Sequence, residues 1–168
     1  MESSGRSEDE RPTAALDRRR VPVDQLDMKI LARLLVDGRV SFRQVAHELR
    51  TSTTTVSSRV SRLEKAGVIS GYSAAVNFEA LGYDLTAIVG IVVSKGKLSL
   101  TETEIAKLPG VCAVYDVTGD NDAFIVAKFR RREELSRFAK GLLGMQFVER
   151  ANTHVVLSTV KEDFRLSL

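Results

Sequence analysis

Apolar residues recur at helical spacing near the start of the chain. The stripe consists of Leu26, Ile30 and Leu34, and Gly38 follows the last turn, which predicts a first helix. Ser41, followed three residues later by Gln44, has the form of a capping box, so a second helix is expected to begin there. Its apolar face consists of Phe42, Val45, Ala46 and Leu49.

A third helix is predicted over residues 52–65. Ser52 is a good N-cap residue, and Gly67 stands where a helix commonly stops. The inward stripe of this helix consists of Val56, Val60 and Leu63. Only Arg50 and Thr51 separate it from the second helix. Three short helices with so tight a connection predict a helix-turn-helix, a DNA-binding motif.

The boundaries of the expected domains follow from changes in this pattern. Residues 1–20 are charged and poor in large apolar side chains, which indicates a flexible tail. Residues 21–76 form the predicted winged helix-turn-helix domain, in which alternation around Gly71 suggests a small β-hairpin, the wing. Residues 77–83 are the expected linker, and residues 84–168 the second domain.

The second half of the chain alternates between strand and helix patterns. Apolar runs predict strands at 85–93, 111–118, 123–129 and 148–160, and a helix is expected at 133–143. Thr101 and Glu104 have capping-box spacing and predict another helix, which Pro109 and Gly110 end. The order βαββαβ is typical of a ferredoxin-like domain, so the fold class is α+β.

Composition excludes several classes of protein. Hydrophobic residues make up 43% and charged residues 28% of the chain, as in ordinary globular proteins. The longest apolar run, residues 87–93, is far shorter than the roughly 20 residues of a membrane-spanning helix, so we expect a cytoplasmic protein without a membrane partner. One cysteine and two histidines form no zinc pattern, and we expect Cys112 to be a buried small residue of a strand.

The positive charge is concentrated in the predicted DNA-binding domain. Residues 21–75 hold eight Lys and Arg against five Asp and Glu, and this surplus accounts for the net charge of +3. The outer face of the third helix combines hydroxyl and basic side chains, which suit a groove edged by phosphates. The predicted DNA contacts are Thr53, Thr54, Ser57, Ser58, Arg59, Ser61, Arg62 and Lys65.

Individual roles follow from position on that helix. Thr53, Thr54 and Ser58 are expected at base edges, because the N-terminal part of a recognition helix usually enters the groove deepest. Arg62 and Lys65 are expected at phosphates. For Arg59, near the apolar seam, a phosphate contact and a structural ion pair both stay open. Short hydroxyls discriminate poorly between bases, so modest sequence selectivity is expected.

These residues form an ordered series that resembles the Lrp/AsnC, or feast/famine, family of transcription regulators. The resemblance covers residues 22–165. The segments that carry it are 24–31, 37–39, 62–72 and 81–83, with Val56 and Arg59. It implies a winged helix joined to an effector-binding βαββαβ domain, which pairs into homodimers through its sheet and often assembles further into octamers.

Residues 119–122, Gly-Asp-Asn-Asp, match the effector loop of that family. The resemblance implies that this loop binds an amino acid or another small effector between subunits, and that the last strand contributes Thr153. The predicted effector contacts are Gly119, Asp120, Asp122 and Thr153. Gly, Asn and Asp are also ordinary hairpin-turn residues, so a purely structural loop stays open. The family often has an aromatic residue where Asn121 stands.

Two other functions are compatible with the same pattern. An architectural protein that wraps DNA would share its physics, and siroheme decarboxylases resemble both domains. The decarboxylase needs a basic, histidine-bearing tetrapyrrole pocket, whereas His47 belongs to the second helix and His154 stands alone. No nucleophile and base, phosphate loop or metal-ligand cluster can be assembled, so we expect no catalysis and no cofactor.

Overall fold

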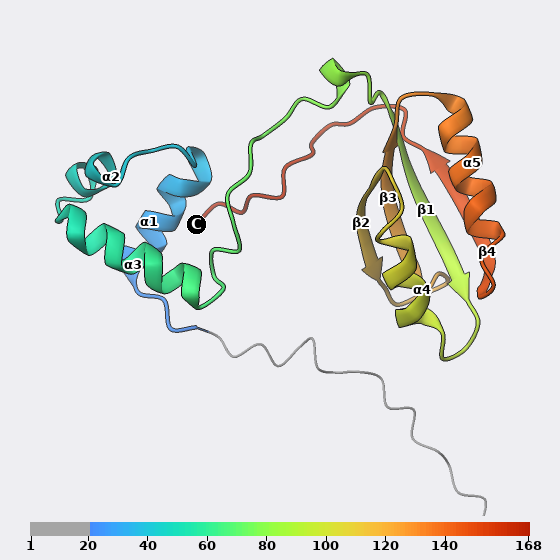
Figure 1. Cartoon of the computed structure of the whole chain (residues 1–168), viewed down its shortest axis with the longest axis horizontal. Coiled ribbons are helices and arrows are strands. Elements are labelled where there is room, and N and C mark those ends of the chain that lie inside the picture. The colour runs from blue at the N-terminus through green and yellow to red at the C-terminus, as the bar shows by residue number, and fades with distance from the viewer. Residues whose placement is uncertain (1–20) are drawn as a thin grey trace, which may run out of the picture. The chain divides into compact units, whose positions relative to one another are not determined.

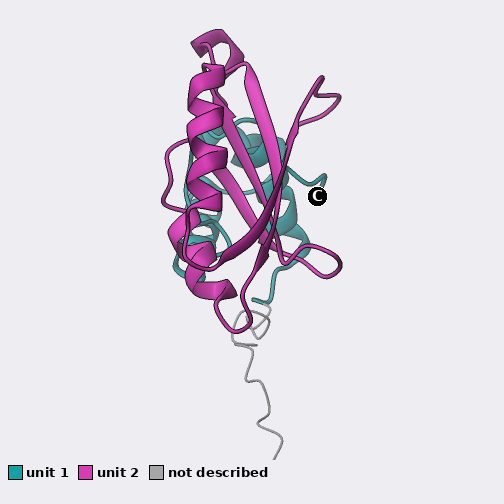
Figure 2. Ribbon diagram, turned by 90° about the vertical axis from the view of Figure 1, so that its right-hand side faces the viewer, with its two compact units in different colours: residues 1–74, 164–168 teal, residues 75–163 magenta. Residues whose placement is uncertain are grey.

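A computed structural model describes residues 21–168 of the chain. The tail expected at residues 1–20 lies outside the described residues. The chain divides into two compact units, one formed by residues up to 74 together with 164–168, the other by 75–163 (Figure 2). Each unit is described by itself.

The first unit contains three helices around a small apolar core (Figure 1). They are α1 (Gln25–Val36), α2 (Phe42–Glu48) and α3 (Thr53–Lys65). The centre of the core consists of Ile30, Val45, Ala46, Val56 and Val60, all at most 3% exposed. The helical spacing in the sequence therefore predicted both the helices and the faces that they bury.

The turn between α2 and α3 has an unusual backbone. Arg50 has φ of 52°, and among described residues other than glycine no further one has positive φ. The amide of Thr51 donates to the carbonyl of Ala46 at 2.9 Å, which closes the end of α2. This left-handed residue lets the chain reverse within Arg50 and Thr51, where helices commonly use glycine.

The wing prediction is wrong in one respect. Residues 68–76, all of which the structure describes, contain no strand. Val68, Tyr72 and Val76 are 37%, 55% and 46% exposed, so the alternation has no core against which to pack. A two-stranded hairpin without such a surface is marginal at best.

The second unit is a four-stranded antiparallel sheet with two helices. Its elements are β1 (Leu85–Val93), α4 (Leu98–Ile105), β2 (Val111–Asp116), β3 (Ala123–Phe129), α5 (Arg132–Leu143) and β4 (Val148–Val155), and a short 3₁₀ turn at Glu79–Leu81 precedes them. The strand order is β2-β3-β1-β4. Both helices cover the same face of the sheet (Figure 2), and alternate residues of β1 and β3 pack beneath them with Ile105 and Leu142. The α+β class and the βαββαβ order are confirmed.

Several boundaries differ from the sequence prediction. The helix α4 begins at Leu98, and Thr101 is a buried residue inside it whose hydroxyl donates to the carbonyl of Lys97, so the predicted cap there is wrong. Strand β4 ends at Val155, where pairing with β1 ends, instead of at residue 160. The expectation that Cys112 is buried is also wrong: the residue is exposed, at the irregularity between Val111 and Ala113 where it has no partner on β3.

Candidate functional site

The first candidate surface is the exposed side of α3. Val56, Val60 and Leu63 are at most 1% exposed and fix which side of the helix faces inward. Of the predicted DNA contacts, Ser61 is half-buried and five residues that point outward are exposed. That group consists of Thr53, Thr54, Ser57, Ser58 and Lys65. The hydroxyl-rich face that the sequence predicted is therefore presented by the fold.

Local hydrogen bonds occupy some of these hydroxyls. The Ser52 hydroxyl accepts from the backbone amide of Thr55 at 3.0 Å and lies 2.8 Å from its hydroxyl, so the predicted N-cap is confirmed. The Ser58 hydroxyl donates to the Thr55 carbonyl at 3.0 Å. The proton of Ser58 is thus engaged within the helix, while its oxygen still has an acceptor lone pair.

Two partly exposed arginines of α3 bind carboxylates at the start of α1. Arg59 donates to Asp24 and, at 3.0 Å, to Asp27. Arg62 donates to the other oxygen of Asp27 and, at 3.1 Å, to the carbonyl of Pro22. The sequence left open whether Arg59 contacts a phosphate or forms a structural ion pair, and the structure shows the ion pair. Arg62 also neutralises the fully buried Asp27 carboxylate, which requires a cation. Its side chain is still 44% exposed, so the phosphate contact expected of it stays a prediction.

The two aspartates also cap α1. The Asp27 amide donates to Asp24 at 2.9 Å and the Asp24 amide donates to Asp27 at 3.0 Å, a complete capping box. The hydrogen bond from Arg59 is the main cause that lowers the pKa of Asp24 to about 2. Burial by itself would raise the pKa of Asp27, but the bonds from Asp24, Arg62 and Arg59 outweigh it and lower that pKa.

Sequence reasoning missed this capping box and found one at Ser41. There the Ser41 hydroxyl accepts from the Gln44 amide at 3.2 Å, but the Gln44 side chain binds Glu48 instead of closing the box. The signal was present, since Asp24-x-x-Asp27 has the right spacing. An acidic residue at the third position performs the task that Glu or Gln usually performs.

The second candidate surface is the loop between β2 and β3. Gly119 has φ of 121° and is exposed with Asp120. Asp122 is tied to the end of β1: its amide donates to the Ile91 carbonyl at 2.8 Å and its carboxylate accepts from the Val93 amide at 2.8 Å. One carboxylate oxygen of Asp122 therefore has a structural role, and the other has no such bond in the described chain.

Asn121 is the loop residue that the sequence reasoning undervalued. Its side chain lies against Gly90, so closely that a Cβ there would be 2.8 Å from the Asn121 amide group. The side-chain oxygen of Asn121, Oδ1, is buried and has no hydrogen-bond partner within residues 21–168. A buried polar atom without a partner is costly, which marks this position as unusual.

Strand register decides which β4 residues accompany the loop. Asn152 pairs with Gly90, so it lies on the same face as Asn121, whereas Thr153 pairs with Val89 on the face that the helices cover. Arg150 donates to the Asp120 carbonyl at 3.0 Å. The structure therefore brings Asn152 and Arg150 to the loop, and it places the predicted contact Thr153 on the other face.

The part of the chain that the structure describes contains neither a metal-binding cluster nor a membrane-spanning helix. No cluster of three His, Cys, Asp or Glu residues there could hold a metal ion. Among the same residues, the helices are too short or too polar for one to span a membrane.

Each of the two units matches a known family of domains. Residues 23–70 match a winged helix-turn-helix DNA-binding model, and residues 86–166 match the Lrp/AsnC ligand binding domain. An HTH-type transcriptional regulator of Pyrococcus abyssi is 49% identical over 144 residues, which are 86% of this chain and 98% of that protein. The regulator FL11 of Pyrococcus horikoshii is 34% identical over 89% of this chain and 99% of its own length.

Solved structures agree with these relatives. Escherichia coli AsnC is 25% identical and superposes with a TM-score of 0.80 over 85% of this chain and 97% of its own. A transcriptional regulator of Neisseria meningitidis, solved in complex with L-Met, is 26% identical with a TM-score of 0.79 over 86% and 96%. The curated relatives named above are regulators and not enzymes.

Proposed function

The chain belongs to the Lrp/AsnC family and is a DNA-binding transcription regulator, and from that premise we propose how its two surfaces act. Paired α3 helices of an oligomer bind operator DNA, and a small effector, an amino acid in the simplest case, binds at residues 119–122. The observation that carries the proposal is the outward face of α3, which combines exposed hydroxyls with a lysine.

The roles on α3 follow from the hydrogen bonds. Thr53, Thr54 and Ser57 approach base edges, since their hydroxyls are exposed and form no hydrogen bond within the described chain. Lys65 binds a phosphate from the last turn. Arg59 and Arg62 hold α3 against α1 and so set its angle, because their charges are already compensated by Asp24 and Asp27.

The oligomer is proposed to form through the face of the sheet that lies opposite α4 and α5, here called the open face. Ile88 and Tyr115 on this face are 38% and 45% exposed, and Phe124 and Val126 beside them are half-buried. A contiguous apolar area on a sheet face marks an interaction surface. Pairing with a second copy would cover it and bring two α3 helices to one DNA molecule.

The loop is proposed as the effector site because of Asn121. Its unpartnered carbonyl oxygen can accept a hydrogen bond from a ligand ammonium or amide group, and the glycine at 119 permits close approach. The Neisseria meningitidis regulator with L-Met shows that a relative of the same fold binds an amino acid. The polar Asn121 favours a polar amino acid for this chain.

Fluorescence anisotropy with operator and random DNA at fixed salt tests the DNA-binding proposal. Lys65→Ala should weaken binding to both DNAs and reduce the slope of log K against log salt by about one. Thr54→Ala should weaken operator binding selectively. Ser73→Ala, an exposed change outside α3, is the matched control. Equal affinity of the unchanged protein for both DNAs would favour an architectural DNA-wrapping protein over an operator-specific regulator.

A thermal-shift screen of the amino acids tests the effector proposal. A binding amino acid should raise the melting temperature of the full chain, and Asn121→Leu should abolish that shift while the protein stays folded. Asn121 is the better position to change, because Asp122 also supports the end of β1. A hit that persists unchanged in Asn121→Leu would place the effector elsewhere.

A further inference from the structure

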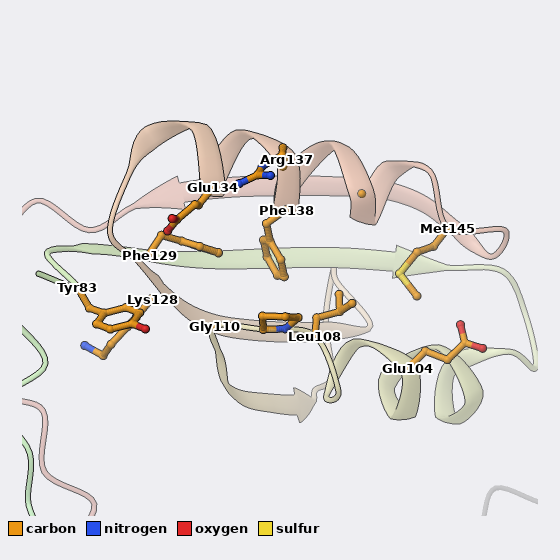
Figure 3. A pocket seen from close by; sticks show the side chains of 12 residues that line it. Tyr83, Glu104, Leu108, Gly110, Lys128, Phe129, Glu134, Arg137, Phe138 and Met145 are labelled. Atoms are coloured by element: carbon orange, nitrogen blue, oxygen red, sulfur yellow. The ribbon is translucent and has the colours of Figure 1, made fainter. Parts of the chain in front are cut away.

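A cavity lies between α4 and α5, above the sheet, and residues 119–122 are not part of its lining (Figure 3). Its volume is about 760 Å³, within the range of small-molecule sites, and Tyr83 stands at one end with Glu104 at the other. It opens beside the start of β2 and the end of β3. Phe129 lies at the end of β3 away from the loop, about 20 Å along that strand from Ala123, and Glu104 and Met145 line the other end of the cavity.

The floor of the cavity is apolar. Phe129 and Phe138 pack against each other with their ring centroids 5.1 Å apart and the rings tilted by 49°, and Leu108 and Met145 line the cavity beside them (Figure 3). The wall below is rigid: the Lys128 amide donates to the Gly110 carbonyl at 2.8 Å, and a Cβ on Gly110 would be 2.7 Å from the Lys128 carbonyl. The cavity is therefore preformed.

Gly141 supplies an independent observation. It lies inside α5, where glycine is a poor helix former, and its backbone does not adopt the left-handed conformation that would require glycine. Apart from its two neighbours and the backbone of α5 itself, nothing in the described chain lies within 4 Å of where its Cβ would be. Neither backbone geometry nor internal packing thus explains this glycine. It leaves space in the cavity wall for something that is not part of the subunit.

The charged side chains around the cavity indicate the charge of a ligand that would bind there. Glu134 is compensated by Arg131, and Lys128 by Glu162. Arg137, from the same helix as Gly141, has neither a hydrogen bond nor an ion pair within residues 21–168. A guanidinium above an apolar floor suits an anion with an apolar body, and it binds carboxylates in a bidentate manner. Glu104, at the far end, disfavours a second negative group.

We propose that this cavity binds a small monocarboxylic acid with an apolar, aliphatic or aromatic, body. The carboxylate pairs with Arg137, and the apolar body lies over Phe129, Phe138 and Met145 beside Gly141. This site is separate from the effector loop and stands whether or not that loop binds an amino acid.

Isothermal titration calorimetry of the full chain with 4-phenylbutyrate tests the proposal, and 4-phenylbutylamine serves as the ligand of opposite charge. The carboxylate should bind and the amine should not. Arg137→Gln should weaken carboxylate binding at least tenfold. Arg132→Gln removes the same charge from the same helix outside the cavity and should leave binding unchanged. Equal binding of acid and amine, or an unaltered Kd in Arg137→Gln, would overturn the proposal.

Gly141→Leu provides a variant that blocks the cavity without breaking the fold. Because the position has open space and leucine favours helix, the melting temperature should not fall, and carboxylate binding should be lost. Retained binding in this variant overturns the proposal. Binding that is lost in Asn121→Leu instead assigns the acid to the loop and also overturns it. If the unchanged protein does not bind the carboxylate and Gly141→Leu changes the oligomer mass, a second copy of the chain occupies the cavity, and the proposal is overturned.

Discussion

At the residue scale, Asp27 decides how the DNA-binding unit holds its recognition helix. Its carboxylate is fully buried and accepts from Arg59, Arg62 and the Asp24 amide. The sequence could not reveal this, because the arginines lie 32 and 35 positions away and equally suit phosphate contacts. Spacing along one helix predicts which residues share a face, but a partner on another helix depends on how the helices pack.

Asp27→Asn should destabilise the protein by about 2 to 4 kcal/mol, since it leaves two guanidiniums without their shared carboxylate. The value is below that of a fully buried pair, because both arginine side chains are partly exposed and can be solvated. Urea unfolding of the full chain measures this change. Asp84→Asn, at an exposed position, is the control and should stay within about 0.5 kcal/mol of the unchanged protein.

The lowered pKa values of Asp24 and Asp27 predict a pH dependence of the same unit. A carboxyl whose pKa is lower in the folded than in the unfolded state contributes stability above the unfolded value, near 3.9, and loses it as the pH falls through the folded value. With Asp24 near 2, stability should decline between about pH 4 and pH 2.

Urea midpoints measured across that range test the pH dependence. Asp24→Asn should flatten the profile relative to the unchanged protein, and Asp84→Asn should not. A profile of Asp24→Asn as steep as that of the unchanged chain would contradict the assignment to this carboxyl.

At the element scale, the N-cap of α3 is the feature that sequence and structure agree on most closely. Ser52→Ala removes the acceptor of the Thr55 amide and should cost about 1 kcal/mol of folding free energy. Chemical denaturation gives the value, and Ser73→Ala is the neutral comparison. The loss should also weaken DNA binding, because α3 carries the proposed contacts in its first turns. An unchanged unfolding free energy would show that the cap is dispensable.

Elements that face a core were predicted best. Strands β1 and β3 match their predicted bounds because one face of each is buried against α4 and α5 along nearly its whole length, and the residues between are mostly apolar as well. The predicted wing and the last residues of β4 failed for the opposite reason. Their alternation has no surface to pack against, and alternation alone does not supply hydrogen-bonding partners.

At the scale of the whole molecule, the open face links the sheet to DNA binding. Ile88→Glu should place a charge within the proposed contact between copies and shift the mass measured by light scattering toward the monomer. Operator affinity should fall with it, because two recognition helices would no longer act together. Lys140→Glu, which changes charge on the helix-covered side, should alter neither. An unchanged mass in Ile88→Glu would place the contact on another surface.

Whether a candidate site could be predicted depends on how far apart in the sequence its residues lie. The face of α3 could be predicted because it depends on the periodicity of one helix. The loop environment could not, since Asn121 meets Gly90 through the pairing of β1 with β3, and Asn152 shares that face only through the pairing of β1 with β4. The cavity beside Gly141 needs α4, the turn that follows it, β3 and α5 to come together.

The strand order β2-β3-β1-β4 also has a consequence for the newly made chain. The central strand β1 is synthesised first, yet both of its partners follow it, and β4 ends only at Val155. At translation rates of 5 to 20 residues per second, the interval from Val93 to Val155 lasts roughly 3 to 12 s. The most apolar segment of the chain has neither neighbour until β3 is complete at Phe129, and it lacks β4 for the rest of that time. The ribosome-bound chain is therefore most exposed to aggregation before β3 is made, and one edge of β1 stays uncovered until the last strand follows.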